Sequence, residues 1–336
     1  MAIAPPPVPP DCPVRLVSIG MPVFNGQNYL GKAIDSVLAQ SCGDFELIIC
    51  DNASTDATPE ICRAYAAQDR RVRYVRNAHN LGAGPNFDLC FALSQGRFFL
   101  WAAHDDMLAP EYLARAVAAL EAAPEAVMCV AGITEIGAND EVIRHYATDL
   151  AAVGSPDPVR RFASVIHAHH QCEDLFGVYR RSALLGSGLI GTYSGSDRVL
   201  LAEMALRGRW LRLREHLFLH RDHAQRATRA LLLVDREAAL RWQDPAASAR
   251  RGSLFHVVLY RHYWRVVCRN THGLTRLRCG VQLLRWWYTD GHFADVVRDL
   301  LQNIDPHLLN LVRMIKRAAL GSHRDLRPGS LPTLEP

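Results

Sequence analysis

Residues 98–106 read FFLWAAHDD, an apolar run that leads directly into one histidine and two aspartates. The run from Phe98 to Ala102 has the length and hydrophobicity of a buried strand. Two adjacent carboxylates at a strand end repel one another unless a cation compensates them. Hard divalent ions such as Mg²⁺ or Mn²⁺ prefer carboxylates together with phosphate oxygens. The segment therefore predicts a metal site at Asp105 and Asp106, with a solvated aspartate pair as the plainer alternative.

Outward from this segment, short apolar runs alternate with helical patterns. Such alternation is typical of βαβ units and predicts an α/β fold with a mainly parallel sheet flanked by helices. In such sheets, ligands bind beyond the carboxyl ends of the strands. The expected strands are Leu16 to Met21, Phe45 to Cys50, Val72 to Val75, Phe98 to Ala102, Val127 to Val130, Leu175 to Tyr179 and Leu211 to Leu219.

Length and composition restrict the class of protein. The 336 residues can form one large α/β domain and an accessory segment, and a net charge of +4 gives no reason to expect nucleic acid as a partner. Nine cysteines without a CxxC pair argue against disulfides and zinc. The proline-rich start lacks the basic and apolar regions of a signal peptide, and no apolar run reaches the ~20 residues of a membrane span. We expect a cytoplasmic protein that touches a membrane only from its inner face.

The chain divides into four predicted parts. A hairpin is expected at the polar turn Gly137 to Asp140, and the pattern is helical throughout after about residue 230. The predicted parts are a disordered lead-in (1–13), a domain of two halves (14–132 and 133–228), a C-terminal helical segment (229–320) and a disordered tail (321–336).

Two further strand ends carry unusual polar residues. Pro22 to Gly26 forms a rigid turn whose aromatic Phe24 suits a base-binding pocket, although any βα turn can contain these residues. Asp51 closes the second strand, where its carboxylate can accept a hydrogen bond from a pyrimidine imide or a ribose hydroxyl. Helix capping alone would explain the polar residues from Ser54 to Asp56, but it does not explain Asp51.

These strand ends, in this order and spacing, resemble the family 2 glycosyltransferases with their GT-A nucleotide-sugar-binding fold. The resemblance covers about residues 15 to 225 and implies nucleotide-sugar contacts from Pro22, Asn25 and Asn80. It also implies that Phe24 and Asp51 hold the nucleobase, that Asp105 meets the ribose or the metal, and that Asp106 binds Mn²⁺ or Mg²⁺. The motifs that carry it are Val17 to Asn25, Asp51 to Asp56, Asn80 to Gly82 and Trp101 to Asp106.

The resemblance further implies an inverting transfer with a general base downstream. Such a base takes the proton from the acceptor hydroxyl as that hydroxyl attacks the anomeric carbon. Asp197, in Gly195-Ser196-Asp197 at the start of a helical pattern, is the predicted base, although the family carries Glu where Ser196 stands. An N-cap role for Asp197 is the alternative, and Asp174 is the second candidate base.

The segment from His220 to Gln225 resembles an Arg-x-His motif of the family. The resemblance implies that His223 completes the metal or diphosphate site and that Arg221 contacts phosphate. With 15 histidines in the chain, a surface histidine is the alternative interpretation of His223.

The C-terminal segment from residue 230 carries 16 basic and 9 acidic residues, and aromatic residues lie among its arginines. Such a face could lie on an anionic membrane that presents a lipid-linked acceptor. It could equally pack on the catalytic domain or on a second subunit in a homodimer.

The predicted function is an inverting, metal-dependent hexosyltransferase that uses a UDP- or dTDP-sugar and a glycan or lipid-linked acceptor. By resemblance, its setting is bacterial cell-surface glycan synthesis. One alternative is a catalytically silent nucleotide-sugar-binding or scaffolding protein of the same fold. A nucleotidyltransferase is a further alternative, but Asn25 to Asn28 lacks the arginine and lysine expected of its glycine-rich loop.

Overall fold

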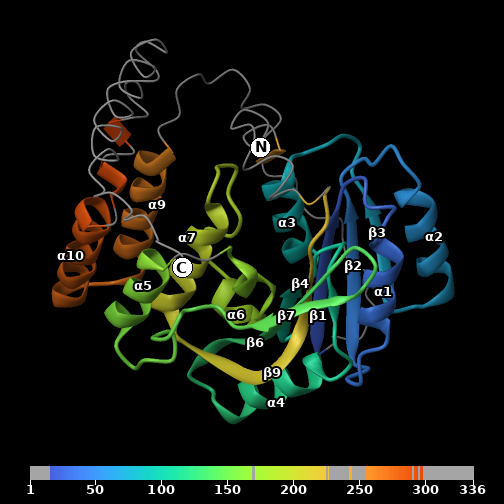
Figure 1. Ribbon diagram of the computed structural model, residues 1–336, viewed down its shortest axis with the longest axis horizontal. Coiled ribbons are helices and arrows are strands. Elements are labelled where there is room, and N and C mark those ends of the chain that lie inside the picture. The colour runs from blue at the N-terminus through green and yellow to red at the C-terminus, as the bar shows by residue number, and fades with distance from the viewer. Residues whose placement is uncertain are drawn as a thin grey trace, which may run out of the picture.

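The computed structural model describes residues 16–168, 171–224, 226, 242–243, 255–289, 291–293 and 296–297. Within these ranges, nine strands form one sheet in the order β3-β2-β1-β4-β8-β6-β9-β5, and β7 pairs with β6 (Figure 1). The strands are β1 (Val17–Val23), β2 (Phe45–Asp51), β3 (Val72–Arg76), β4 (Phe98–Trp101), β5 (Met107–Leu108), β6 (Ala126–Ile136), β7 (Val142–Tyr146), β8 (Val178–Arg180) and β9 (Arg209–Arg221). The helices are α1 (Leu30–Leu38), α2 (Thr58–Gln68), α3 (Ala83–Ala92), α4 (Tyr112–Ala122), α5 (Pro158–His167), α6 (Arg181–Leu184), α7 (Ser196–Arg207), α9 (Phe255–Asn270) and α10 (Gly273–Thr289), with one 3₁₀ turn, η1 (Glu173–Phe176).

The sheet has a parallel half and a mixed half. Strands β3, β2, β1 and β4 are all parallel, as the alternation of strands and helices predicts. Strand β8 is antiparallel to both β4 and β6, so β6 runs in the same direction as β4, and β9 is parallel to β6. The carboxyl ends of β1, β2, β4, β6 and β9 therefore meet at one edge of the sheet. The predicted α/β fold is confirmed, with parallel pairing concentrated in its first half.

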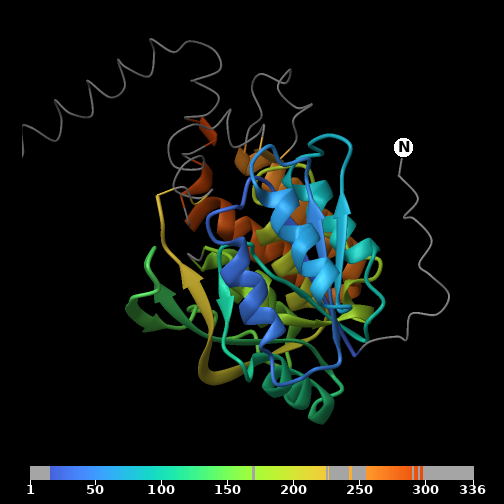
Figure 2. The same ribbon diagram turned by 90° about the vertical axis from the view of Figure 1, so that its right-hand side faces the viewer.

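Alternating side chains divide the core between the two faces of the sheet. In β4, Phe98 and Leu100 pack with α1, α2 and α4, whereas Phe99 and Trp101 pack on the opposite face with α3, α5 and α7. Figure 2 shows α1 and α2, in blue, in front of the sheet. This period of two is the pattern of a strand buried on both faces. Gly20 in β1 allows α3 to approach closely, because a Cβ atom there would lie 2.6 Å from Cβ of Cys90.

Helices α9 and α10 form a hairpin that packs outside α5 and α7, on the left of Figure 1. They confirm the expected helical character of the C-terminal segment within the described residues, while the predictions for 1–13 and 321–336 lie outside those residues. None of the helices that the structure describes combines the length and hydrophobicity that a transmembrane span requires. None of the eight described cysteines forms a disulfide.

Helix α5 was not predicted from the sequence. Asp157 caps it by accepting a hydrogen bond from the backbone N–H of Val159 at 2.9 Å, and Pro158 occupies its first position. Both residues are ordinary helix-start signals.

Candidate active site

Hydrogen bonds join the loops that follow β1 and β2. Asn25 adopts a left-handed conformation with φ of 52°. Its backbone N–H donates to Oγ of Ser54 at 2.9 Å, and its Oδ1 accepts from the backbone N–H of Thr55 at 2.8 Å. Phe24, next to this junction, is 40% exposed. These hydrogen bonds hold the two loops together, and the partly exposed ring of Phe24 lies beside them.

Asp51 lies at the end of β2 with its side chain fully buried. Its Oδ1 accepts a hydrogen bond from the backbone N–H of Ser54 at 2.8 Å, and its Oδ2 accepts from the hydroxyl of Tyr74 at 2.7 Å. Nε of Arg76 lies 3.5 Å from Oδ2. Each carboxylate oxygen can accept more than one hydrogen bond. A nucleobase contact at Asp51 stays a prediction, and it would have to share Oδ2 with Tyr74. Pro22 lies inside β1, paired with Cys50.

Asn80 belongs to a network of asparagines that holds the loop before α3. Nδ2 of Asn52 donates to Oδ1 of Asn80 at 2.8 Å, and Oδ1 of Asn52 accepts from Nδ2 of Asn77 at 3.1 Å. Asn77 also donates to Asn86, whose Nδ2 donates to the carbonyl of Cys50 at 2.8 Å. Sequence reasoning missed Asn52, Asn77 and Asn86 because their partners are distant in the chain.

The two aspartates after β4 each contact a histidine from the segment around the end of β9. Oδ1 of Asp106 accepts a hydrogen bond from the backbone N–H of Arg221 at 2.8 Å and lies 3.1 Å from Nδ1 of His220. Oδ2 of Asp105 lies 3.0 Å from Nε2 of His223. The structure thus places the predicted ligand His223 beside Asp105, and it pairs Asp106 with His220, which sequence reasoning missed.

The charge on these histidines controls the ionisation of Asp105. Burial raises the pKa of its carboxyl, but the charges of His104 and His223 and the hydrogen bond from His223 outweigh burial, so the pKa lies well below its usual range. Burial also lowers the pKa of His220, yet the charge and hydrogen bond of Asp106 raise it overall. Nε2 of His220 is buried without a hydrogen-bond partner among the described residues.

Arg221 has a different environment from the one predicted. Its side chain is fully buried, and its Nε donates to the carbonyl of Asp105 at 2.9 Å. Its Nη1 donates to the carbonyl of Gly137 at 3.0 Å and pairs with Asp140 at 2.5 Å. The guanidinium also lies 4.7 Å from the ring centroid of Tyr29. These contacts give Arg221 a role in joining β9, the β6–β7 turn and the aspartate loop, and they leave a phosphate contact as a prediction.

The donor set fits a hard divalent ion with phosphate as the remaining ligand. Within the described ranges, no three His, Cys, Asp or Glu side chains already converge on one point. Asp105, Asp106 and His223 nevertheless supply carboxylate oxygens and an imidazole at one sheet edge. Mg²⁺ and Mn²⁺ commonly take one or two carboxylates and complete their coordination with substrate phosphates and water.

The two candidate bases differ in accessibility. Asp197 lies in the first turn of α7 and is half-buried, and the thiol of Cys172 hydrogen-bonds to it. Asp174 is almost completely buried, and burial raises the pKa of its carboxyl. Nη2 of Arg212 lies 3.8 Å from its Oδ1. A general base must reach the acceptor hydroxyl, so these environments favour Asp197.

Comparison with known proteins identifies the class. The chain resembles solved structures of S. aureus TarS (residues 1–349), with a TM-score of 0.59 and 15% identity over 85% of this chain and 80% of that one. It also resembles the mannosyltransferase PcManGT from Pyrobaculum calidifontis, solved with GDP-Man and Mn²⁺, with a TM-score of 0.51 and 14% identity over 91% and 81% of the two chains. At these identities the likeness shows the fold, which is that of GT-A glycosyltransferases.

The sequence comparisons give the family. The model described as glycosyl transferase family 2 matches residues 18–185, half of the chain, so the chain belongs to that family. The putative glycosyltransferase EpsE of Bacillus subtilis (strain 168) is 35% identical over 106 residues, which are 31% of this chain and 38% of EpsE. Glycosyltransferase GlyG of Streptococcus pneumoniae serotype 4 is 30% identical over 94 residues, 28% of this chain and 31% of GlyG. These matches span well under two thirds of the relatives' own length.

Proposed function

We propose that the chain is an inverting, metal-dependent glycosyltransferase that moves a hexose from a UDP- or dTDP-sugar to the hydroxyl of a glycan or lipid-linked acceptor. The observation that carries the proposal is the pairing of Asp105 with His223 and of Asp106 with His220 at the sheet edge that also holds Phe24. We propose synthesis of a bacterial cell-surface glycan, at the inner face of the membrane, as the setting.

The chain's own residues would divide the work between donor and acceptor. Asp105, Asp106 and His223 would hold Mn²⁺ or Mg²⁺, which supplies charge neutralisation for the departing diphosphate. His220 would hold Asp106 in place through Nδ1, and Phe24 would lie against the nucleobase. Asp197 would accept the proton of the acceptor hydroxyl. The hydroxyl oxygen then bonds to the anomeric carbon as the bond to the diphosphate oxygen breaks.

The fold is compatible with more than one nucleotide in the sugar donor. One TarS structure was solved with UDP, whereas PcManGT was solved with GDP-Man. One architecture hosts many specificities. The preference for a pyrimidine rests on Asp51, whose carboxylate could accept a hydrogen bond from an imide N–H.

A thermal-shift panel tests donor and metal together. UDP, dTDP, GDP and CDP are each added with and without Mn²⁺ to the wild type and to Asp106→Asn, which keeps a hydrogen-bond acceptor but loses the charge. A ligand at 100 times its Kd stabilises the folded state by about 2.7 kcal/mol. We expect UDP or dTDP to stabilise the wild type only with Mn²⁺, and the variant to lose that response. Stabilisation without turnover of any donor would favour the silent scaffold, and no response to any nucleotide would contradict both functions.

A further inference from the structure

Helix α10 is apolar on two faces. Its buried face carries Cys279, Leu283 and Trp286, which belong to the core. Its outer face exposes apolar side chains three or four residues apart, a spacing that places them on one stripe. With Trp264 of α9 they make up the hairpin patch, whose members are 41–72% exposed: Trp264, Leu274, Leu277, Val281, Leu284 and Tyr288.

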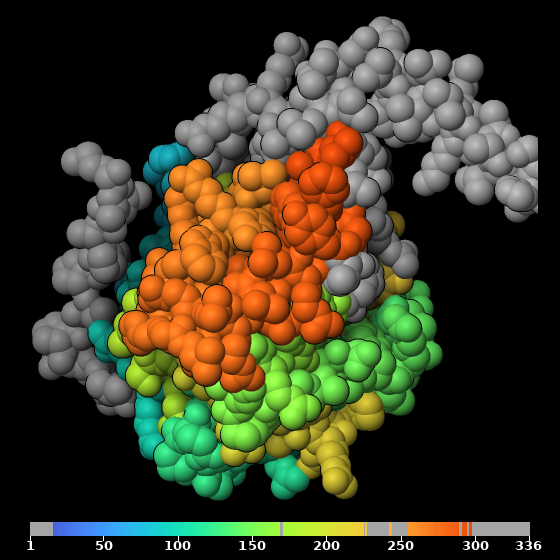
Figure 3. Space-filling view, turned by 90° about the vertical axis from the view of Figure 1, so that its left-hand side faces the viewer, coloured from blue at the N-terminus to red at the C-terminus, as the bar shows by residue number. Residues whose placement is uncertain are grey.

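Trp264 connects the two helices of the hairpin patch. A Cβ atom on Gly280 would lie 3.5 Å from the ring of Trp264. Leu277 and Leu284 stand one helical turn before and after Gly280, so they flank the point where Trp264 crosses. Figure 3 shows α9 and α10, orange to red, side by side at the surface of the molecule. The patch is therefore a continuous apolar surface, of the kind that marks an interaction site on a protein.

The charged side chains of the hairpin itself are all arginines. Residues 255–289 contain six arginines and no aspartate or glutamate. Arg269 pairs with Glu203 of α7, and Arg278 pairs with Asp157 at 2.6 Å. Arg261 and Arg265 are exposed on α9, close to Trp264 in sequence. Apolar and aromatic side chains among arginines are typical of helices that lie in the interface of an anionic membrane.

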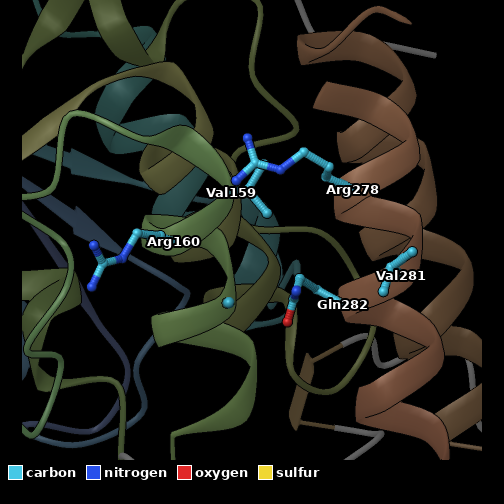
Figure 4. A pocket seen from close by; sticks show the side chains of 6 residues that line it. Val159, Arg160, Arg278, Val281 and Gln282 are labelled. Carbon is cyan, nitrogen blue, oxygen red and sulfur yellow. The ribbon is translucent and has the colours of Figure 1, made fainter. Parts of the chain in front are cut away.

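A hollow of about 210 Å³ adjoins the patch at Val281, between α5 and α10. Arg160 and Arg278 both line it, but Figure 4 shows that Arg278 reaches toward α5 whereas the guanidinium of Arg160 points away from α10. The hollow therefore lacks the converging cations of a phosphate site, and the surface as a whole is the candidate.

We propose that the hairpin patch docks on an anionic lipid bilayer. A second copy of this chain fits the surface less well, because a two-fold interface would bring the arginines of both hairpins together.

The docking does not depend on the proposed transfer reaction, yet it bears on that reaction. The ring of Tyr193 stacks on His262 of α9 at 3.7 Å, and a Cβ on Gly195 would lie 3.3 Å from Leu259. Helix α9 of the hairpin thus packs against the loop that leads to Asp197. Docking would therefore bring the acceptor half of the site to the membrane surface.

Flotation with vesicles tests the proposal on the full chain. The vesicles contain phosphatidylcholine alone or phosphatidylcholine with phosphatidylglycerol. We expect the wild type to float with the anionic vesicles, less at high salt, and to stay at the bottom with the neutral ones. The double variant Leu277→Ser/Leu284→Ser should reduce the bound fraction about tenfold, because two exposed leucines no longer enter the bilayer. Arg261→Glu/Arg265→Glu should abolish the preference for phosphatidylglycerol.

The matched control is Val142→Ser/Ile143→Ser on β7, which removes side chains that are also 50–60% exposed but lie outside the patch. This control should float like the wild type. Flotation that is absent, equal on neutral vesicles, or unchanged in Leu277→Ser/Leu284→Ser overturns the proposal. A wild-type dimer in lipid-free sedimentation that the same variant converts to monomer also overturns it. If that variant loses its folded circular dichroism spectrum, Leu274→Ser/Tyr288→Ser makes the same test.

Discussion

The carboxyl edge of the sheet and the α9–α10 hairpin differ in which side chains they bury and which they expose. At the sheet edge, polar groups such as Asp51, Asn52 and Arg221 are buried, and each is hydrogen-bonded to a group of a neighbouring loop. On the hairpin, apolar groups such as Leu277 and Leu284 are exposed. Burying a polar group is costly unless its hydrogen bonds are made, and exposing a large apolar surface is costly unless something covers it. The sheet edge therefore holds its side chains in fixed positions, whereas the hairpin has the properties of a binding surface.

The largest expected effect is on catalysis. Asp197→Asn should lower kcat by about 10²–10⁴, because general-base catalysis contributes on that order. The melting temperature should change little, since Asn can keep the polar contacts of this half-buried site. Steady-state kinetics with the donor identified by the nucleotide panel measures the effect. Arg261→Glu/Arg265→Glu on the hairpin, assayed with a water-soluble acceptor, serves as the control and should keep the wild-type kcat. An Asp197→Asn enzyme with wild-type kcat would rule out this base.

A leucine-to-alanine substitution should change the free energy of unfolding by different amounts in the sheet and in the hairpin. Leu100→Ala removes a fully buried side chain from the central strand β4 and should cost about 2–5 kcal/mol in free energy of unfolding. Leu277→Ala removes an exposed side chain from the hairpin patch and should stay within about 0.5 kcal/mol. Urea denaturation without lipid measures both. A large loss for Leu277→Ala would mean that the patch is covered by part of the protein itself.

A pH effect is expected at Asp88, which links α3 to the loop ahead of Asp197. Its Oδ1 accepts a hydrogen bond from the backbone N–H of Ile190 at 2.9 Å, and burial raises its pKa to about 7 although that hydrogen bond lowers it. A raised carboxyl pKa stabilises the folded state below the unfolded pKa, near pH 4. That stabilisation is lost as pH rises to about 7.

Asp88→Asn should therefore be more stable than the wild type at pH 8, by about 4 kcal/mol at most. The difference should shrink as pH falls from 7 to 4. Urea denaturation curves across this range measure it. Parallel stability profiles for the two proteins would contradict a raised pKa.

The smallest expected effect concerns the asparagine network. Asn52→Ala should lower the free energy of unfolding by about 1–3 kcal/mol, because the amide of Asn77 loses one of its two acceptors and the N–H of Leu81 loses its acceptor. It should also raise KM for the donor, since the loop at Asn80 loses its anchor. Asn139→Ala, at the exposed tip of the β6–β7 turn, is the control and should change neither quantity. An unchanged KM with lower stability would limit the network to a structural role.

The sequence by itself determined the strands of the parallel half of the sheet and their order along the chain. Apolar runs and helical periodicity found the strands from β1 to β4, the start of α7 and the β6–β7 hairpin, because these depend on neighbours within a few residues. Local signals of the same kind, Asp157 and Pro158, also stand at the start of α5. The motifs around Asp51 and Asp105 identified the family, and the match of the family model to residues 18–185 confirms it.

Only the tertiary structure decided the contacts between distant segments. Asp106 and His220 are 114 residues apart, and no spacing rule pairs them. The burial of Arg221 and the network of Asn52, Asn77 and Asn86 depend likewise on how strands and loops meet at one edge. Whether Leu277 faces the core or water depends on which side of α10 packs against α5. Periodicity records that a helix has an apolar face, but only packing shows whether that face is covered.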